Sequence, residues 1–419
     1  MRAAFALLAL ATAQLAVVGP AAARQAGSAW EGCGERLCYA ENLAPFFTRL
    51  GESRRDGGEP VRIIQIGDSH TAGDMITNGW REALRERYGQ GGRGVLAAGR
   101  PYAGYLTWGV TASQTAGWEV NSIFGRGYAN YGRPIGISGF SQTARAAGES
   151  LGVTADAPEQ FFDRIIVCAI REPGAGTVTL RLGFETERWA LDAQERTTEC
   201  RTLDSDYPQL GASLRTEDDH IVTVTSFATM RRQGGVSLSN LGVSGSQLVH
   251  QARATDSVAQ VELRTYQPDL LVFAFGTNEG FSQQLTPASF EATLRAQVTR
   301  FRQLMGRDVP ILLIGAPDAN TRNRGLADNF GAPVACSEGW YTPTLLAELR
   351  VRQRRVAREM GLAFWDWDAA MGGRCSAHDW RTRDLMRGDH VHFNQAGGAR
   401  IGRMIFADLE RAASERPPR

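Results

Sequence analysis

The sequence predicts an α/β protein, built on a doubly wound parallel sheet that is interrupted by an inserted antiparallel β-sandwich. Three observations favour this class. Continuous apolar runs alternate with segments of helical periodicity near both ends of the chain. A long middle interval holds short runs of alternating polarity instead. The length of 419 residues, with 43% hydrophobic and 22% charged residues, leaves room for two domains.

The parallel sheet is predicted from apolar runs without alternation, which are typical of strands buried on both faces. Five candidate strands lie at residues 63–66, 236–241, 270–275, 311–315 and 362–367. Helical spacing occurs at residues 75–89, 248–264, 287–305, 343–360 and 396–413. Two of these helices follow a Thr-Pro pair, which indicates a capping threonine and a proline at the first helical position.

The insertion is predicted because about 130 residues separate the first helix from the next strand, where such connections usually take only a few. The interval contains RIIVCAI, TVTLRLGF, ERWALDA and HIVTVTSFA, which are typical of antiparallel strands. We expect a sandwich over residues 106–234, and an extended lid with local hairpins is the alternative. The α/β domain that the sandwich interrupts then spans residues 60–105 and 235–413, after an N-terminal extension at 24–59.

The first 23 residues resemble a secretory signal, with Arg2 before an Ala/Leu-rich run that ends in three alanines. An uncleaved membrane anchor is the alternative, and no other stretch is long and apolar enough to span a bilayer. Six cysteines fit an exported protein with disulfides. Pairing in sequence order joins Cys33 to Cys38, Cys168 to Cys200 and Cys336 to Cys375, although six cysteines allow 15 pairings.

Charge and motif content exclude several function classes. The net charge of +1 gives no basic field for nucleic acid or anionic membrane. All 46 cationic residues are arginines, so no P-loop lysine or Schiff-base lysine is present. The GQGGRG stretch at 89–94 follows a helix rather than a strand, which reverses the dinucleotide-binding context. No spacing of Cys and His indicates a zinc site, and we expect neither metal nor organic cofactor.

Four polar segments follow predicted strands or precede the last helix, and therefore fall at one edge of the sheet, where ligands bind in doubly wound folds. They are GDSH with Ser69, NLGVSG with Gly245, GTNE with Asn278 and DHVHF with His392. Together these types suffice for acyl transfer. A serine needs a base, the base needs an acidic partner such as Asp389, and the oxyanion needs aimed N–H donors. We expect those donors to be the Ser69 N–H, the Gly245 N–H and the Asn278 amide.

The ordered set of Ser69, Gly245, Asn278 and His392 resembles the four blocks of SGNH (GDSL-type) hydrolases, over residues 60–105 and 235–412. The third block departs from the common Gly-x-Asn-Asp, because Glu279 stands in the last place. GDSHTAGD, GTNEG, FWDWDAAMGG and DHVHFNQAGG look specifically like bacterial peptidoglycan O-acetylesterases, which also carry an inserted sandwich resembling a carbohydrate-binding module. The resemblance implies a three-layer fold, a cell-envelope location and removal of O-acetyl groups from muramic acid.

The alternatives in function are an O-acetyltransferase with the same acyl-enzyme, a lipase or thioesterase of the same superfamily, and a non-catalytic glycan-binding protein. The partner we expect is an acetylated glycan, with no nucleic acid and no stable membrane insertion after signal cleavage. The oligomeric state is open.

Several site residues have a second interpretation. Ser69 at a strand-to-helix turn fits a helix cap as well as a nucleophile. Asp68 fits a structural role in that turn. For His70 we expect a position at the surface or in contact with substrate. His390 competes with His392 as the base, and Gly242 competes with Gly245 as the backbone donor.

Aromatic residues offer weaker signals. Trp108, Trp118 and Tyr131 in the insertion fit either sugar stacking or core packing. Trp365 and Trp367 fit packing at a strand end. His220, His250 and His378 have no partner that the sequence identifies.

Overall fold

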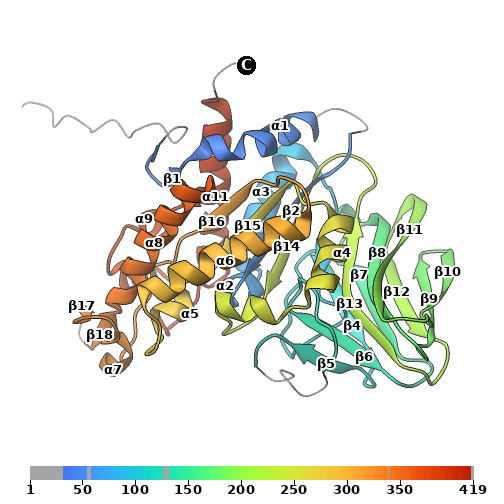
Figure 1. Ribbon diagram of the computed structural model, residues 1–419. Helices are drawn as coiled ribbons and strands as arrows, with labels where there is room; N and C mark the ends of the chain where they lie inside the picture. Colours follow the sequence, from blue (N-terminus) through green and yellow to red (C-terminus); the bar gives the residue numbers. More distant parts are fainter. Residues whose placement is uncertain (1–31, 54–57, 126–131, 338, 417–419) are drawn as a thin grey trace, which may run out of the picture.

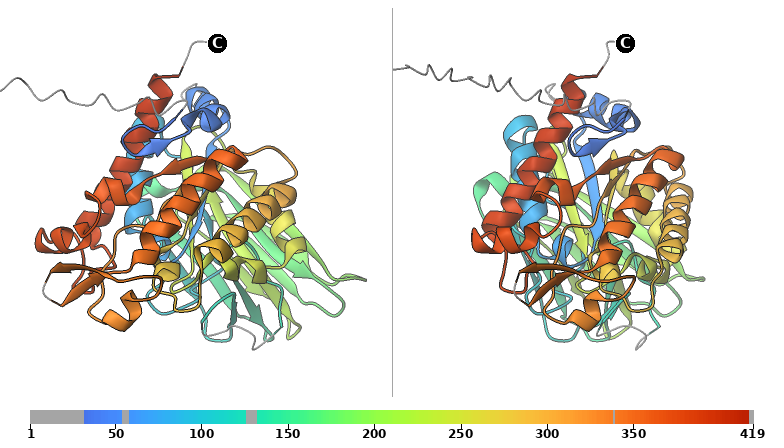
Figure 2. Two further views of the ribbon diagram at one scale, coloured as in Figure 1. Left: turned by 60° about the vertical axis from the view of Figure 1, so that its left-hand side comes forward. Right: turned by 90° about the vertical axis from the view of Figure 1, so that its left-hand side faces the viewer.

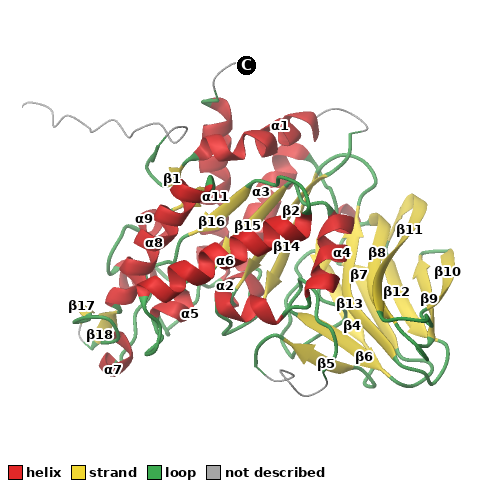
Figure 3. Cartoon of the chain, in the orientation of Figure 1, coloured by secondary structure: helices red, strands yellow, loops and turns green. Residues whose placement is uncertain are grey.

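The predicted α/β class is confirmed by a computed structural model, which describes residues 32–53, 58–125, 132–337 and 339–416. A six-stranded sheet in the order β1-β19-β16-β15-β2-β14 forms its centre (Figures 1 and 3). Five of the strands are parallel, and only β1 runs antiparallel to its neighbour. The strands are β1 (Leu37–Cys38), β2 (Val61–Gly67), β14 (Val236–Gly242), β15 (Leu270–Ala274), β16 (Ile311–Ile314) and β19 (Ala363–Trp365).

Helices cover both faces of this sheet, as the two turned views in Figure 2 show. One face packs on α1 (Ala44–Ser53), α3 (Met75–Tyr88) and α11 (Gln395–Ser414). The other packs on α4 (Asp256–Tyr266), α6 (Pro287–Met305) and α8 (Thr344–Met360). Strands β14, β15 and β16 are buried throughout, which explains why their sequences are apolar or small at almost every position.

A β-sandwich occupies the chain between α3 and β14. One sheet has the order β10-β9-β12-β7-β4, and the other has the order β11-β8-β13-β6-β5 with β3 added beside β13. The two sheets share one apolar core. The strands are β3 (Gly94–Leu96), β4 (Val110–Gln114), β5 (Glu119–Ser122), β6 (Phe140–Ala144), β7 (Ser150–Ala155), β8 (Phe162–Arg171), β9 (Thr177–Leu182), β10 (Glu185–Ala190), β11 (Thr197–Gln209), β12 (Gly211–Thr216) and β13 (Val222–Met230).

The second sheet begins earlier in the chain than expected. Residue 106 was the predicted start of the insertion, yet β3 at Gly94–Leu96 already pairs with β13. The sandwich also packs against α4 of the central domain, beside which it lies in Figure 1. Glu262 on α4 is buried there and accepts hydrogen bonds from Thr225, Ser226 and the Ile137 N–H. The sandwich is therefore held against the central domain by polar as well as apolar contacts.

Two predicted helices differ in detail. The segment 248–264 is not one helix, because the chain extends at Ala254 between η3 (Leu248–Arg253) and α4. There Thr255 donates its N–H to the Ile135 carbonyl, which draws the backbone out of helical geometry. The predicted cap of α8 is also wrong. Thr342 belongs to β18 (Trp340–Thr342) and donates to Asp318, so Pro343 takes the cap position.

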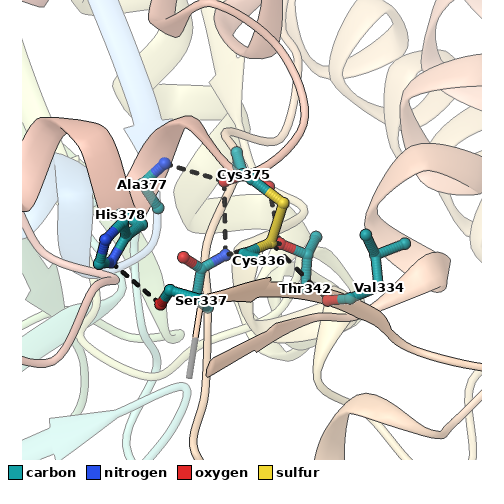
Figure 4. Close-up of a disulfide and its surroundings, with 9 residues drawn as sticks. Val334, Cys336, Ser337, Thr342, Cys375, Ala377 and His378 are labelled. Carbon is teal, nitrogen blue, oxygen red and sulfur yellow. Dashed lines mark hydrogen bonds between the residues drawn. A yellow bond between two sulfur atoms is a disulfide. The ribbon is translucent and has the colours of Figure 1, made fainter. Parts of the chain in front are cut away.

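The predicted cysteine pairing is the pairing in the structure, which contains Cys33–Cys38, Cys168–Cys200 and Cys336–Cys375. Figure 4 shows the last of these, which joins β17 (Val334–Ser337) to the start of α10 (Ser376–Thr382). The expected signal segment and Tyr131 lie outside the described residues. Among the helices that are described, none combines the length and hydropathy needed to cross a bilayer.

Candidate active site

Ser69 lies at the carboxyl end of β2, where the strand turns into the four-residue helix α2 (Ser69–Ala72). Asp68 caps this helix by accepting the His70 N–H at 2.9 Å. Burial raises the pKa of Asp68 to about 8, which outweighs the hydrogen bonds that its carboxylate accepts. Asp68 therefore has the structural position expected from the sequence, and Ser69 is the first residue of the helix that it caps.

Three predicted site residues form one hydrogen-bonded chain. The Ser69 hydroxyl lies 3.0 Å from His392 Nε2, and His392 Nδ1 lies 2.8 Å from Asp389 Oδ2. The other carboxylate oxygen of Asp389 accepts the backbone N–H groups of Val391 and His392. Partial burial opposes the charge on Asp389, but its hydrogen bonds with His392 and Val391 prevail and hold its pKa well below the ordinary value. A charged carboxylate thus fixes the orientation of the imidazole.

His390 is excluded from this chain by its backbone. It has a φ of +54° and stacks on Trp340, with ring centroids 3.6 Å apart and planes 5° apart. Burial lowers the pKa of His390 to about 4, so the ring is neutral at pH 7. Of the two competing histidines, only His392 contacts the Ser69 hydroxyl.

The two glycines that compete as backbone donor, Gly242 and Gly245, lie in different surroundings. A Cβ atom on Gly242 would lie 2.1 Å from the Ala72 nitrogen, so Gly242 permits β14 to pack directly against α2. Gly245 has a φ of +78° and lies in the loop beyond the strand. Among the hydrogen bonds of the described residues, neither the Gly245 N–H nor the Ser69 N–H has an acceptor. Within the described part of the chain, both N–H groups are therefore without an acceptor, as the predicted oxyanion role requires.

Asn278 lies on the adjoining loop, in the short helix α5 (Thr277–Gly280) after β15. Its side-chain nitrogen donates to the Ser246 carbonyl at 2.9 Å, which leaves the second amide hydrogen for a ligand. Its backbone carbonyl accepts from the Gln247 side chain at 3.2 Å. Two hydrogen bonds therefore join the loop of Gly245 to the loop of Asn278.

Glu279, the residue that departs from the family pattern, also joins these loops. Its two carboxyl oxygens accept the Leu248 N–H at 2.7 Å and the Gly276 N–H at 3.0 Å. Burial raises its pKa to about 7, even though these N–H groups favour the charged form. The longer side chain of glutamate spans from α5 to the first residue of η3.

Of the two positions expected for His70, the surface is wrong, because the residue is 6% exposed, whereas contact with substrate stays a prediction, because His70 lines the cavity beside Ser69. Its ring packs edge-on against Trp367 and Phe393, with its centroid 5.5 Å from that of His392. Burial lowers the pKa of His70 to about 3, so it supports His392 as a neutral ring. Trp367 and Trp365 are both buried, which fits the packing role expected for this pair.

A cavity of about 300 Å³ opens beside Ser69 and His392. Its other lining residues are His70, Ala72, Gly73, Met75, Ile76, Tyr102, Gly104, Leu106, Ser244, Arg387 and Phe393. The segment 102–106 precedes β4, and it carried no sequence signal for a site. Arg387 was missed as well, because an exposed arginine in a loop has no distinguishing pattern. Of the insertion's candidate aromatics, Trp118 is 6% exposed and belongs to the core of the sandwich.

The three histidines without an assigned partner have one in the structure. His220 lies 3.3 Å from Asp218, His378 bonds to Ser337, and His250 accepts the Gln247 N–H. Within the described ranges, no group of three or more His, Cys, Asp or Glu side chains is arranged to hold a metal ion.

Known proteins similar to this chain are acyl hydrolases and esterases. Residues 225–400 match the GDSL-like lipase/acylhydrolase family. A solved structure of a peptidoglycan O-acetylesterase is 26% identical with a TM-score of 0.73, and the match covers 90% of this chain and 98% of that chain. No curated protein sequence matches the chain.

Two further structures are less similar. A family two carbohydrate esterase from Clostridium thermocellum is 12% identical with a TM-score of 0.30, covering 70% of this chain and 98% of that chain. A salicylyl-acyltransferase from a tetracycline biosynthetic pathway is 13% identical with a TM-score of 0.33, and the match covers 77% of this chain and 96% of that chain.

The fold, the matched family and the similar structure together define the class. The protein is an esterase with an SGNH hydrolase fold. Residues 225–400 are similar to GDSL-like acylhydrolases, and the chain resembles a peptidoglycan O-acetylesterase over nine-tenths of its length.

Proposed function

We propose that the protein is an exported serine esterase that removes O-acetyl groups from cell-envelope glycan, most of all peptidoglycan, through an acyl-enzyme. The single observation that carries this proposal is the hydrogen-bonded chain from Ser69 through His392 to Asp389 at the edge of a small cavity. The similarity to a peptidoglycan O-acetylesterase supports the choice of substrate. Three disulfides support export to an oxidising compartment, the periplasm or the cell envelope.

The first half of the reaction forms the acyl-enzyme. His392 Nε2 takes the proton of the Ser69 hydroxyl while the Ser69 oxygen attacks the acetyl carbonyl carbon. Asp389 keeps the proton of His392 on Nδ1, so that Nε2 is the free base, and stabilises the imidazolium that forms. The tetrahedral oxyanion lies among the Ser69 N–H, the Gly245 N–H and the Asn278 amide. Collapse breaks the ester bond, and His392 gives its proton to the departing sugar hydroxyl.

The second half repeats these steps with water. His392 removes a proton from water, whose oxygen attacks the acetyl-Ser69 carbonyl. Collapse of the second tetrahedral intermediate releases acetate and returns the proton to Ser69. Only the protein's own groups move protons in this sequence.

The cavity favours a short acyl group. Its volume of about 300 Å³ lies at the lower limit for ligand pockets, and Gly73, Gly104 and Ala72 form part of its wall. The lipase alternative requires room for a long fatty acyl chain, and chain-length preference on acyl esters tests it.

The test is release of acetate from O-acetylated peptidoglycan, with de-acetylated peptidoglycan as the blank. Ser69→Ala should abolish release, because no other group supplies the nucleophile. Ser414→Ala, which changes an exposed serine near the end of α11, is the matched control and should leave the rate unchanged. Equal acetate release by Ser69→Ala and the wild type would contradict the assignment.

A second arm separates hydrolysis from transfer, since an acetyltransferase would use the same acyl-enzyme. De-acetylated glycan is added as an acceptor, and both free acetate and newly acetylated glycan are measured. Acetate release that exceeds transfer supports the esterase. Transfer that outpaces hydrolysis would identify the alternative reaction.

A further inference from the structure

The inserted sandwich reaches the oxyanion side of the site, and we infer that it supplies a positioning residue there. We propose that Phe124, together with His250, holds the loop of residues 243–246 so that the Gly245 N–H points at the oxyanion. This inference rests on the proposed function. It gives the sandwich a part in the chemical step, separate from any glycan that the sandwich binds.

Phe124 contacts the loop at the proposed donor itself. A Cβ atom on Gly245 would lie 2.9 Å from Cε1 of the Phe124 ring. The same ring stacks on His250, with centroids 4.5 Å apart and planes 17° apart. Phe124 follows β5 of the sandwich, whereas Gly245 and His250 lie after β14 of the central domain.

His250 connects Phe124 to the loop of Asn278, the second proposed oxyanion donor, through hydrogen bonds. Its Nδ1 accepts the Gln247 N–H at 3.0 Å, and the Gln247 side chain donates to the Asn278 carbonyl at 3.2 Å. Burial lowers the pKa of His250 to about 4, so at neutral pH Nδ1 has a lone pair for this bond. The stacked pair of rings therefore contacts one proposed donor and connects by hydrogen bonds to the other.

Phe124 is itself held in place. Its N–H donates to the Ser122 hydroxyl, which donates in turn to the Phe124 carbonyl. Arg253 on η3 donates to the Ile123 carbonyl at 2.9 Å. Ile123 and Val243 belong to one buried apolar cluster, against which Phe124 packs. The segment before Phe124 is thus fixed to both domains.

The loop needs such support because few bonds of its own define its shape. The Val243 N–H donates to the Gly67 carbonyl, the Ser246 N–H donates to the Val243 carbonyl, and the Ser246 carbonyl accepts from Asn278. None of these bonds is made by the peptide group between Ser244 and Gly245, and glycine adopts many backbone conformations at little cost. An oxyanion donor acts only when it is aimed in advance. Removal of the Phe124 ring therefore removes the steric limit on the direction of the Gly245 N–H.

The experiment compares Phe124→Ala with two controls on an aryl acetate and on O-acetylated peptidoglycan. Phe184→Ala removes a 93% exposed phenylalanine from the same sandwich, far from any core, and should leave kcat unchanged. Phe124→Tyr retains the stacked ring and should restore most of the rate. For Phe124→Ala we expect kcat to fall about 10- to 100-fold, less than the full loss of an oxyanion donor, with KM within about threefold.

The mechanism also predicts coupling between the two rings. His250→Ala should lower kcat to a similar extent, and the double variant should be little worse than either single variant. If Phe124→Ala does not fold, Phe124→Leu retains apolar bulk without a stacked ring and should still lower kcat.

An unchanged kcat in folded Phe124→Ala, or a rise in KM alone, would overturn the inference. So would losses that multiply in the double variant. Failure of the substrate proposal has a different signature, since the wild type would then cleave the aryl acetate and leave O-acetylated peptidoglycan intact.

Discussion

Replacement of Asn278 by alanine tests the oxyanion assignment most directly. The side-chain amide has two hydrogens, and one of them is bound to the Ser246 carbonyl at 2.9 Å. The substitution therefore removes one proposed donor to the oxyanion and one hydrogen bond between the loops. These two losses have different consequences, which separate measurements can distinguish.

The loss of the donor acts on the transition state. Removing one oxyanion donor lowers kcat by about 10²–10³, which corresponds to about 2.7–4 kcal/mol. KM should change little, because a ground-state carbonyl oxygen has less charge to stabilise. The loss of the bond to the Ser246 carbonyl acts on folding and should lower the free energy of unfolding by about 1 kcal/mol. The fall in kcat should therefore exceed anything that the change in stability explains.

The assay is steady-state kinetics with an aryl acetate, together with acetate release from O-acetylated peptidoglycan and thermal unfolding. Asn329→Ala is the matched control, because Asn329 also donates to backbone carbonyls near α5, but to those of Gly280 and Ser282 rather than to that of Ser246 in the loop of Gly245. It should keep kcat within about threefold of the wild type. A loss below tenfold in Asn278→Ala, or an equal loss in both variants, would refute the oxyanion role.

Three further outcomes follow. Asp389→Asn should lower kcat by about 10³–10⁴, because an amide does not hold the His392 tautomer; kcat within tenfold of wild type across the pH profile would contradict this. Glu279→Gln should flatten the pH dependence of stability. Burial raises the pKa of Glu279 from its ordinary 4.5 to about 7. The contribution of Glu279 to the free energy of unfolding is therefore fully present below pH 4.5, and about 3 kcal/mol of it is lost as the pH rises from 4.5 to 7. Denaturant unfolding at pH 5 and 8 measures this, and parallel curves for variant and wild type would exclude it. Replacing Cys336 and Cys375 by serine should lower the free energy of unfolding by about 4 kcal/mol for a loop of 39 residues. An unchanged urea midpoint would count against it.

The sequence predicts the central sheet well because its signals are local. An apolar run such as that at 270–275 must be buried on both faces, and the glycines and prolines that follow mark where each element ends. The carboxyl ends of parallel strands meet at one edge, so the order of the elements alone predicts that Ser69 and the distant His392 lie close together. Their contact depends on chain topology, which the order of strands and helices already indicates.

The walls of the site depend on contacts that no local pattern encodes. His70 directly follows the proposed nucleophile in sequence. It is nevertheless buried, because Trp367 and Phe393, which lie some 300 residues further along the chain, pack against it. Phe124 lies about 120 residues from the glycine that it contacts. Each is an ordinary side chain in sequence, and only tertiary packing gives it a place in the site.

Hydrogen bonding on one side and burial on the other divide charge across the proposed site in the direction that acyl transfer requires. On the imidazole side, hydrogen bonds keep Asp389 charged, and that charge stabilises the imidazolium. Near the proposed oxyanion donors, burial raises the pKa of Asp68 to about 8 and that of Glu279 to about 7, which favours the neutral form of Asp68 at pH 7 and that of Glu279 below pH 7. Two ionised carboxylates there would repel the negative charge that develops on the substrate oxygen. The burial of Glu279 that makes the free energy of unfolding depend on pH thus also reduces the negative charge near the proposed oxyanion donors.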